Sequence, residues 1–135
     1  MDRLQALSRP ECLELLARHS LGRVAFTERA LPAIRPVNYA LVGSHVMLRT
    51  NSEGLGRRLD GQIVAFEVDD VDTVMETGWS VVVTGTARLV QEPSELVRAE
   101  AVPLVTLDGP GHQATVCIAP GEITGRRIRP ATDAA

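Results

Sequence analysis

The segment 50–58, TNSEGLGRR, contains the side chains best suited to bind an anion. It begins with three consecutive side chains that can donate hydrogen bonds, namely Thr50, Asn51 and Ser52. Its glycines permit close backbone approach, and Arg57 or Arg58 can neutralise a phosphate. A helix that starts here and runs to about Leu59 would leave backbone amides free. These features predict a phosphate-binding loop, although the local pattern alone favours a solvated connection with surface arginines.

Several other kinds of chemistry are excluded or disfavoured by the residue types present. All fourteen basic residues are arginine, so no lysine can form a Schiff base with a carbonyl substrate or pyridoxal phosphate. Cys12 and Cys117 are too few for a disulfide framework and too isolated for a metal knuckle, which favours two reduced core thiols. His19, His45 and His112 likewise lack metal-ligand spacing.

Composition predicts one globular, cytoplasmic domain. A chain of 135 residues with 44% hydrophobic content is long enough for one core and short for two. The net charge of -3, the pI near 5.6 and the aromatic content of 3% argue against a nucleic-acid surface, which needs basic and stacking groups. No apolar run approaches the ~20 residues of a membrane span, and the amino terminus lacks the apolar core of a signal peptide.

The strongest structural pattern is a pair of β-rich runs, 63–71 and 79–90, joined by a polar connection that ends in Gly78. Alternate residues of the second run are apolar, which is typical of a strand with one buried face. The acidic residues at the end of the first run predict that the hairpin has one buried end and one solvated end.

Further elements are expected on both sides of this hairpin. Ser8 and Glu11 have the spacing of a capping box, which predicts a helix from this point to about Ser20. A second helix should start at Glu92 and run through about Ala101. The remaining predicted strands are 23–27, 32–42, 45–50, 113–119 and 122–128, with Pro120-Gly121 breaking the last two apart. Many short strands favour a small antiparallel barrel, because closure removes exposed sheet edges.

Four segments in this order carry a family resemblance: RPVNYAL, IVAFEVDDVD, GWSVVVTGTARLV and ITGRRI. From Leu7 to Ile128 the chain resembles the pyridoxamine 5'-phosphate oxidase-like, FMN-binding split-barrel family. The resemblance implies a mainly β (α+β) fold, a six-stranded antiparallel split β-barrel with two or three short peripheral helices. It also implies a single flavin-binding domain, 1–128, followed by a flexible tail, 129–135. The usual family assembly is a homodimer with FMN in two clefts between the subunits.

The resemblance also assigns cofactor-binding positions in this chain. The strand whose backbone lines the flavin, and whose arginine reaches toward the phosphate, matches Arg35, Pro36, Val37 and Asn38. The phosphate-side turn matches Thr50, Asn51 and Ser52, in agreement with the anion-binding prediction. Trp79 and Ser80 match a pair that faces the cofactor or the partner subunit, although a core or interface aromatic is an equal alternative for Trp79. Arg126 or Arg127 could reach the site, but a solvated pair is favoured for them.

One departure from the family bears on function. Many members bind the phosphate with a lysine after the turn, where this chain has Gly54-Leu55 in one alignment and Arg57-Arg58 in another.

The main hypothesis is an FMN-dependent oxidoreductase acting on a small conjugated or heteroaromatic substrate, with no catalytic side chain assigned. The alternatives are an F420-dependent reductase, a non-catalytic flavin-binding or sensor protein, and a dimeric barrel without flavin that serves as an interaction module.

Overall fold

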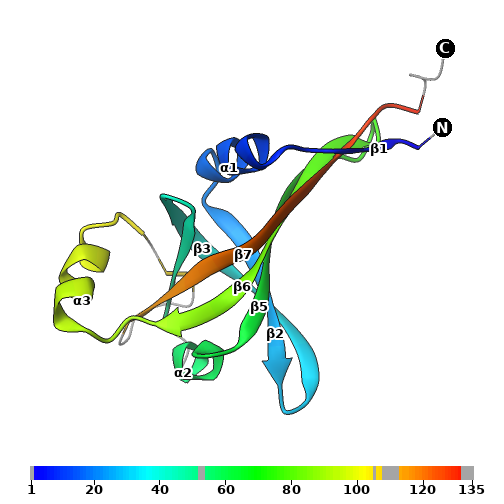
Figure 1. Cartoon of the computed structure of the whole chain (residues 1–135). Helices are drawn as coiled ribbons and strands as arrows, with labels where there is room; N and C mark the ends of the chain where they lie inside the picture. The colour runs from blue at the N-terminus through cyan, green and yellow to red at the C-terminus, as the bar shows by residue number, and fades with distance from the viewer. Residues whose placement is uncertain (1, 52–53, 105, 108–112, 132–135) are drawn as a thin grey trace.

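The computed structural model describes residues 2–51, 54–104, 106–107 and 113–131 of the chain. Within these ranges it contains ten elements, coloured along the chain in Figure 1. The strands are β1 Leu4–Ala6, β2 Leu21–Glu28, β3 Leu31–Val42, β4 His45–Thr50, β5 Ile63–Asp72, β6 Thr77–Leu89 and β7 Ala114–Ile128. The helices are α1 Arg9–Ala17, α2 Leu55–Leu59 and α3 Pro93–Glu100.

Six of the strands form a closed ring. The sheet order is β1-β7-β4-β3-β2-β5-β6, and a further pairing of β6 with β7 joins its two sides. Every pairing is antiparallel. The predicted six-stranded antiparallel split barrel with short peripheral helices is therefore confirmed. The additional strand β1 was not predicted, because it is only three residues long, fully exposed and paired only with the end of β7.

The prediction of two separate strands at the end of the chain was wrong. β7 runs unbroken through Pro120 and Gly121. Opposite them on β6, Thr84 pairs with Glu122 and Gly85 pairs with Pro120, so Gly121 is the extra residue of a β-bulge. A Cβ atom on Gly85 would lie 1.8 Å from the backbone oxygen of Ala119. The strands β6 and β7 approach closely here because residue 85 is glycine. The bulge accommodates Pro120, which the sequence pattern predicted would end the strand.

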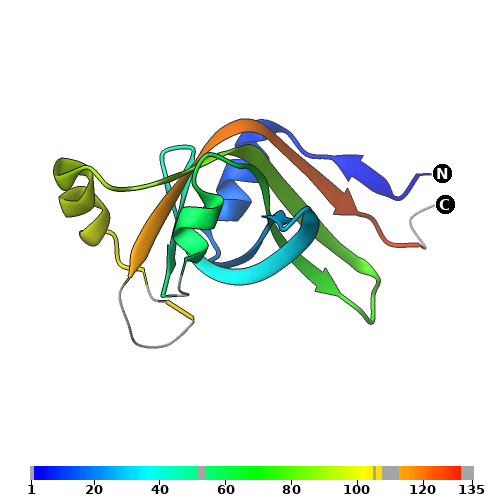
Figure 2. The same ribbon diagram turned by 90° about the horizontal axis from the view of Figure 1, so that it is seen from below.

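The barrel interior is filled by inward-facing side chains and closed by helices at its two ends (Figures 1 and 2). At one end α1 buries Leu16, and at the other α2 buries Leu55 and Leu59. The rings of Tyr39 and Phe66 pack edge to face inside the barrel, with centroids 4.8 Å apart. The Tyr39 hydroxyl donates a hydrogen bond of 2.5 Å to the carbonyl of Leu16, which attaches α1 to the sheet.

Local sequence signals explain how α1 begins. The Glu11 amide donates to the Ser8 hydroxyl oxygen at 3.3 Å, and the Ser8 amide donates to the Glu11 carboxylate at 3.2 Å. These two contacts confirm the predicted capping box. The cap fixes the point at which the chain leaves β1 and crosses the end of the barrel.

The third helix lies outside the ring (Figure 1). It packs through Leu96 and Ala99 against Met47 of β4 and Cys117 of β7. On the other side of the molecule, the β5–β6 hairpin extends past the barrel together with the chain termini (Figure 2). The tip of this hairpin is solvated, with Val74 88% exposed, as predicted from its polar connection.

The predicted tail, 129–135, is described only as far as residue 131. The amide of Arg129 donates to the carbonyl of Arg3 at 2.8 Å and so prolongs the contact between the two ends of the chain. Across the described part of the chain, every helix is too short and too polar to cross a membrane.

Candidate functional site

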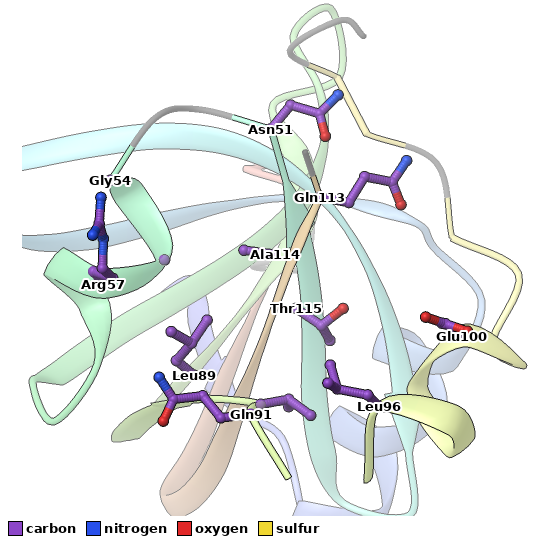
Figure 3. Close-up of a pocket in the computed structure, with 12 residues that line it drawn as sticks. Asn51, Gly54, Arg57, Leu89, Gln91, Leu96, Glu100, Gln113, Ala114 and Thr115 are labelled. Atoms are coloured by element: carbon purple, nitrogen blue, oxygen red, sulfur yellow. The ribbon is translucent and has the colours of Figure 1, made fainter. Parts of the chain in front are cut away.

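Two cavities are lined by residues at the end of β4 or just after it and by residues of α2. The smaller cavity has a volume of about 170 Å³ and is lined by Arg35, Pro36, Val37, Arg49, Thr50, Leu55 and Leu107. The larger cavity has a volume of about 840 Å³ and lies between α2 and α3 (Figure 3). The structure therefore divides the predicted anion-binding segment, with Thr50 at the smaller cavity and Asn51 at the larger.

The smaller cavity is lined by residues of both β3 and β4. Arg35 pairs in the sheet with the fully buried Val24, so strand alternation places both on the inward face. Thr50, only 3% exposed, is the last residue of β4 and lies at the same cavity. Among the described residues, Arg35 forms no ion pair. A half-buried guanidinium beside a hydroxyl is a donor set that suits a phosphate oxygen.

Arg49 has a structural role in this region that the sequence did not predict. Its side chain is buried, with 8% exposure. The guanidinium donates to the carbonyls of Ala99 at 2.6 Å, Leu104 at 3.0 Å and Val102 at 3.4 Å. These carbonyls belong to the end of α3 and the segment that follows it. Arg49 therefore fastens α3 and the chain leading to Leu107 against the barrel. The acceptors are about fifty residues away in sequence, so no local pattern indicates the contact.

Asn51 contributes a second tie to the same segment. Its side-chain amide donates to the hydroxyl of Thr106 at 3.2 Å. Ser52, which was predicted to bind phosphate beside Asn51, lies outside the described residues. Asn38 is on β3 but lines neither cavity.

The structure distinguishes the two arginines of α2. Arg58 lines neither cavity and forms an ion pair with Glu28 on β2, with 2.9 Å between Nη1 and Oε1. Arg57 instead lines the larger cavity, as Figure 3 shows. Because α2 has only one turn and begins at Gly54 without a side-chain cap, its free amides form a weaker feature than the sequence suggested.

Trp79 and Ser80 are not adjacent to either cavity in a single chain. Trp79 is 8% exposed and belongs to the barrel core, where its ring lies 4.9 Å from that of His19. Ser80 is half-buried on the other face of β6, opposite Asp69 of β5 and Arg126 of β7. One subunit therefore does not bring this pair together with Arg35 and Thr50.

Titratable groups with shifted pKa values lie away from the cavities. Burial, followed by the neighbouring Asp69, raises the pKa of Glu67 to about 7, although Arg23 lies 3.3 Å away and opposes the shift. Burial also raises the pKa values of Cys12 and Cys117, which is consistent with the predicted core thiols. Within the described ranges, no three His, Cys, Asp or Glu side chains gather in a way that could hold a metal ion.

The closed six-stranded ring, with helices over its ends and a cationic cavity beside β3 and β4, defines a split-barrel protein. Residues 8–127 match the model of the family described as Pyridoxamine 5'-phosphate oxidase, and the chain belongs to this family.

Individual relatives agree with this assignment. The uncharacterized protein Rv0080 of Mycobacterium tuberculosis is 42% identical, and the match covers 90% of this chain and 84% of the relative. The FAD binding protein from Mycobacterium smegmatis has a similar structure, with a TM-score of 0.78, 36% identity and coverage of 93% of this chain and 98% of that protein. A conserved protein of unknown function, DIP1874 from Corynebacterium diphtheriae, has a TM-score of 0.81 at 30% identity, covering 94% of this chain and 99% of its own.

Proposed function

We propose that this protein binds a flavin, with the flavin phosphate at Arg35 and Thr50 in the smaller cavity. The observation that carries the proposal is the half-buried Arg35 guanidinium, which has no ion-pair partner among the described residues and lines the same cavity as the Thr50 hydroxyl. The flavin ring is proposed to lie along the backbone of Pro36, Val37 and Asn38. A flavin supplies hydride and electron transfer, and these residues would hold and orient it.

We propose that a second subunit completes the site. The smaller cavity, at about 170 Å³, lies below the ~300–1,000 Å³ usual for small-molecule sites, so one chain encloses only part of a flavin. Three large apolar side chains are exposed on the outer face of the adjacent strands β3, β2 and β5: Ile34, Leu21 and Ile63. They provide surface for a homodimer, in which Ser80, half-buried on the face of β6 opposite the core residue Trp79, would approach the flavin from the partner.

FMN is the proposed cofactor, and F420 and FAD are the alternatives. FAD enters because the similar Mycobacterium smegmatis protein is an FAD binding protein. All three carry a phosphate that Arg35 and Thr50 could bind. A visible spectrum of the purified protein, followed by fluorescence titrations with each cofactor, decides between them. Saturation by one of them at one per chain supports the proposal, and no binding of any overturns it.

The role of Arg35 is tested by comparing FMN with riboflavin, which lacks the phosphate. Arg35→Gln is expected to weaken FMN binding about tenfold or more, through loss of charged hydrogen bonds, and to affect riboflavin much less. Arg58→Gln is the matched control, because Arg58 is held by Glu28 outside the cavity. Arg57→Gln tests the other predicted phosphate ligand. If it weakens FMN selectively and Arg35→Gln does not, the phosphate lies in the larger cavity and the assignment to Arg35 is wrong.

For activity, we propose a flavin-dependent oxidoreductase acting on a small conjugated or heteroaromatic substrate. A non-catalytic flavin-binding protein is the second candidate. It is favoured by the absence of any Asp, Glu, His, Cys or Tyr among the described residues that line the smaller cavity. Substrate-dependent reoxidation of the reduced cofactor separates the two, since only the enzyme turns over. A panel of nitroaromatic and quinone acceptors provides the first assay.

A further inference from the structure

The larger cavity has the size of an ordinary ligand site and is formed by different side chains from the smaller one. Its volume of about 840 Å³ falls within the ~300–1,000 Å³ range of small-molecule pockets. None of the residues that line it in the described part of the chain also lines the smaller cavity. It is therefore a separate space that the proposed flavin phosphate does not use.

Opposite charges face this cavity from its two helical walls. Arg57 extends from α2 on one side and Glu100 from α3 on the other, as Figure 3 shows. Both are exposed, and within the described residues neither takes part in an ion pair. Their helical neighbours differ in this respect, because Arg58 pairs with Glu28 and Glu95 pairs with Arg88, at 2.9 Å in each case. Each helix thus presents one unneutralised charge at the cavity, whereas Arg98 of α3, which forms no ion pair among the described residues, lines neither cavity.

Between the charged walls the cavity has an apolar floor with amide groups around it. The floor contains Leu89, Leu96 and Ala114, and amide side chains come from Gln91 and Gln113 (Figure 3). A glycine of α2 lies directly against this floor. A Cβ atom on Gly56 would lie 3.1 Å from the Ala114 Cβ and 3.2 Å from Leu89 Cδ1. α2 therefore packs closely onto the floor, and Arg57 projects from it beside the cavity.

We propose that this cavity binds a small zwitterionic molecule with an unbranched apolar body, whose carboxylate meets Arg57 and whose ammonium meets Glu100. The two charges match the two walls, and the methylene chain covers the apolar floor. The proposal does not depend on flavin binding, since it uses neither Arg35 nor Thr50.

The test uses the whole chain labelled with ¹⁵N and unbranched ω-aminocarboxylates of increasing length, with hexanoate and hexylamine as singly charged controls. Binding is measured by amide chemical shifts. The best ω-aminocarboxylate is expected to bind roughly two- to fivefold more tightly than either control, as solvent-exposed charge pairs allow. The shifted amides are expected in α2, α3 and the start of β7. Arg57→Gln should remove the advantage over hexylamine, and Glu100→Gln the advantage over hexanoate.

Charge exchange provides the decisive comparison. Arg57→Glu and Glu100→Arg should each abolish the preference for the zwitterion. The double variant should restore it, because the ligand can bind end for end. Arg58→Gln and Glu14→Gln are controls of the same charge outside the cavity and should leave binding unchanged. Arg57 and Glu100 are both exposed, so the variants at these two positions are expected to fold.

Three results of the titrations without FMN would overturn the proposal. The first is that no ω-aminocarboxylate binds. The second is that the wild type and Arg57→Gln bind the ω-aminocarboxylate with equal affinity. The third is that the amide chemical-shift changes are confined to other parts of the barrel. Saturating FMN should leave the titration unchanged. Competition by FMN would place the flavin in the larger cavity and would also overturn the second site, whereas a failure of FMN to bind would affect the flavin proposal alone.

Discussion

Arg49 is expected to be the most important polar side chain for the stability of the α3 region. Replacement by Met keeps an unbranched apolar stem and removes the guanidinium. The two short hydrogen bonds, 2.6 Å to Ala99 and 3.0 Å to Leu104, would be lost. Hydrogen bonds from charged groups contribute ~1.5–3 kcal/mol each, and the two longer contacts at 3.4 Å contribute little. Relief of the buried charge offsets part of the loss, so we expect about 3 kcal/mol of destabilisation.

The assay for Arg49→Met is urea unfolding followed by the fluorescence of Trp79, the single tryptophan of the chain, which is buried in the barrel core. Arg88→Met is the matched control. Arg88 also contacts α3, through Glu95, but the pair is exposed and should contribute less than about 1 kcal/mol. Hydrogen exchange of the α3 amides shows whether the helix detaches before the barrel unfolds. The reasoning is refuted if Arg49→Met matches Arg88→Met in both unfolding free energy and α3 protection.

Three further predictions concern the barrel and its first helix. Gly85→Ala should destabilise the protein by about 3 kcal/mol, because its Cβ would meet a backbone oxygen. Thermal unfolding should show a much smaller loss of stability for Gly121→Ala, whose Cβ would lie 3.1 Å from its nearest neighbour. Ser8→Ala should cost about 1 kcal/mol by removing the cap of α1, and an unchanged melting temperature would contradict this role. The pKa of Glu67 is raised from 4.5 to about 7 in the folded protein, so the folded carboxyl keeps its proton between these pH values while the unfolded one loses it. Folding stability should therefore fall as the pH rises from 4.5 to 7. Urea titrations at successive pH values should show that Glu67→Gln abolishes this fall.

The local elements could be predicted from the sequence because their signals are short-range. The capping box of α1, the alternation in β6 and the solvated β5–β6 connection depend on residues within a few positions of one another. The family resemblance added the six-stranded split-barrel architecture, which periodicity alone does not specify. It also placed Arg35, Pro36, Val37 and Thr50 together, and these residues line one cavity.

Other features depend on contacts between distant parts of the chain. Pro120-Gly121 has the local pattern of a strand break, and only the pairing with Thr84 and Gly85 makes it a bulge. Arg57 and Arg58 are equivalent in sequence, and Glu28 on another strand separates their roles by pairing with one of them. The direction of an arginine side chain depends on the acceptors that the fold brings near it, and these can belong to any part of the chain, as Glu28 does for Arg58 and the Ala99 carbonyl does for Arg49.

The sequence by itself determined most of the elements, the family and the absence of lysine chemistry, but neither β1 nor the continuity of β7. Tertiary structure decided which side chains share a cavity. Arg49 is hydrogen-bonded to carbonyls about fifty residues away, and Arg57 of α2 lines the same cavity as Glu100 of α3. Such contacts carry no local sequence pattern, because they arise only when the closed barrel brings α2 and α3 to neighbouring positions beside β7.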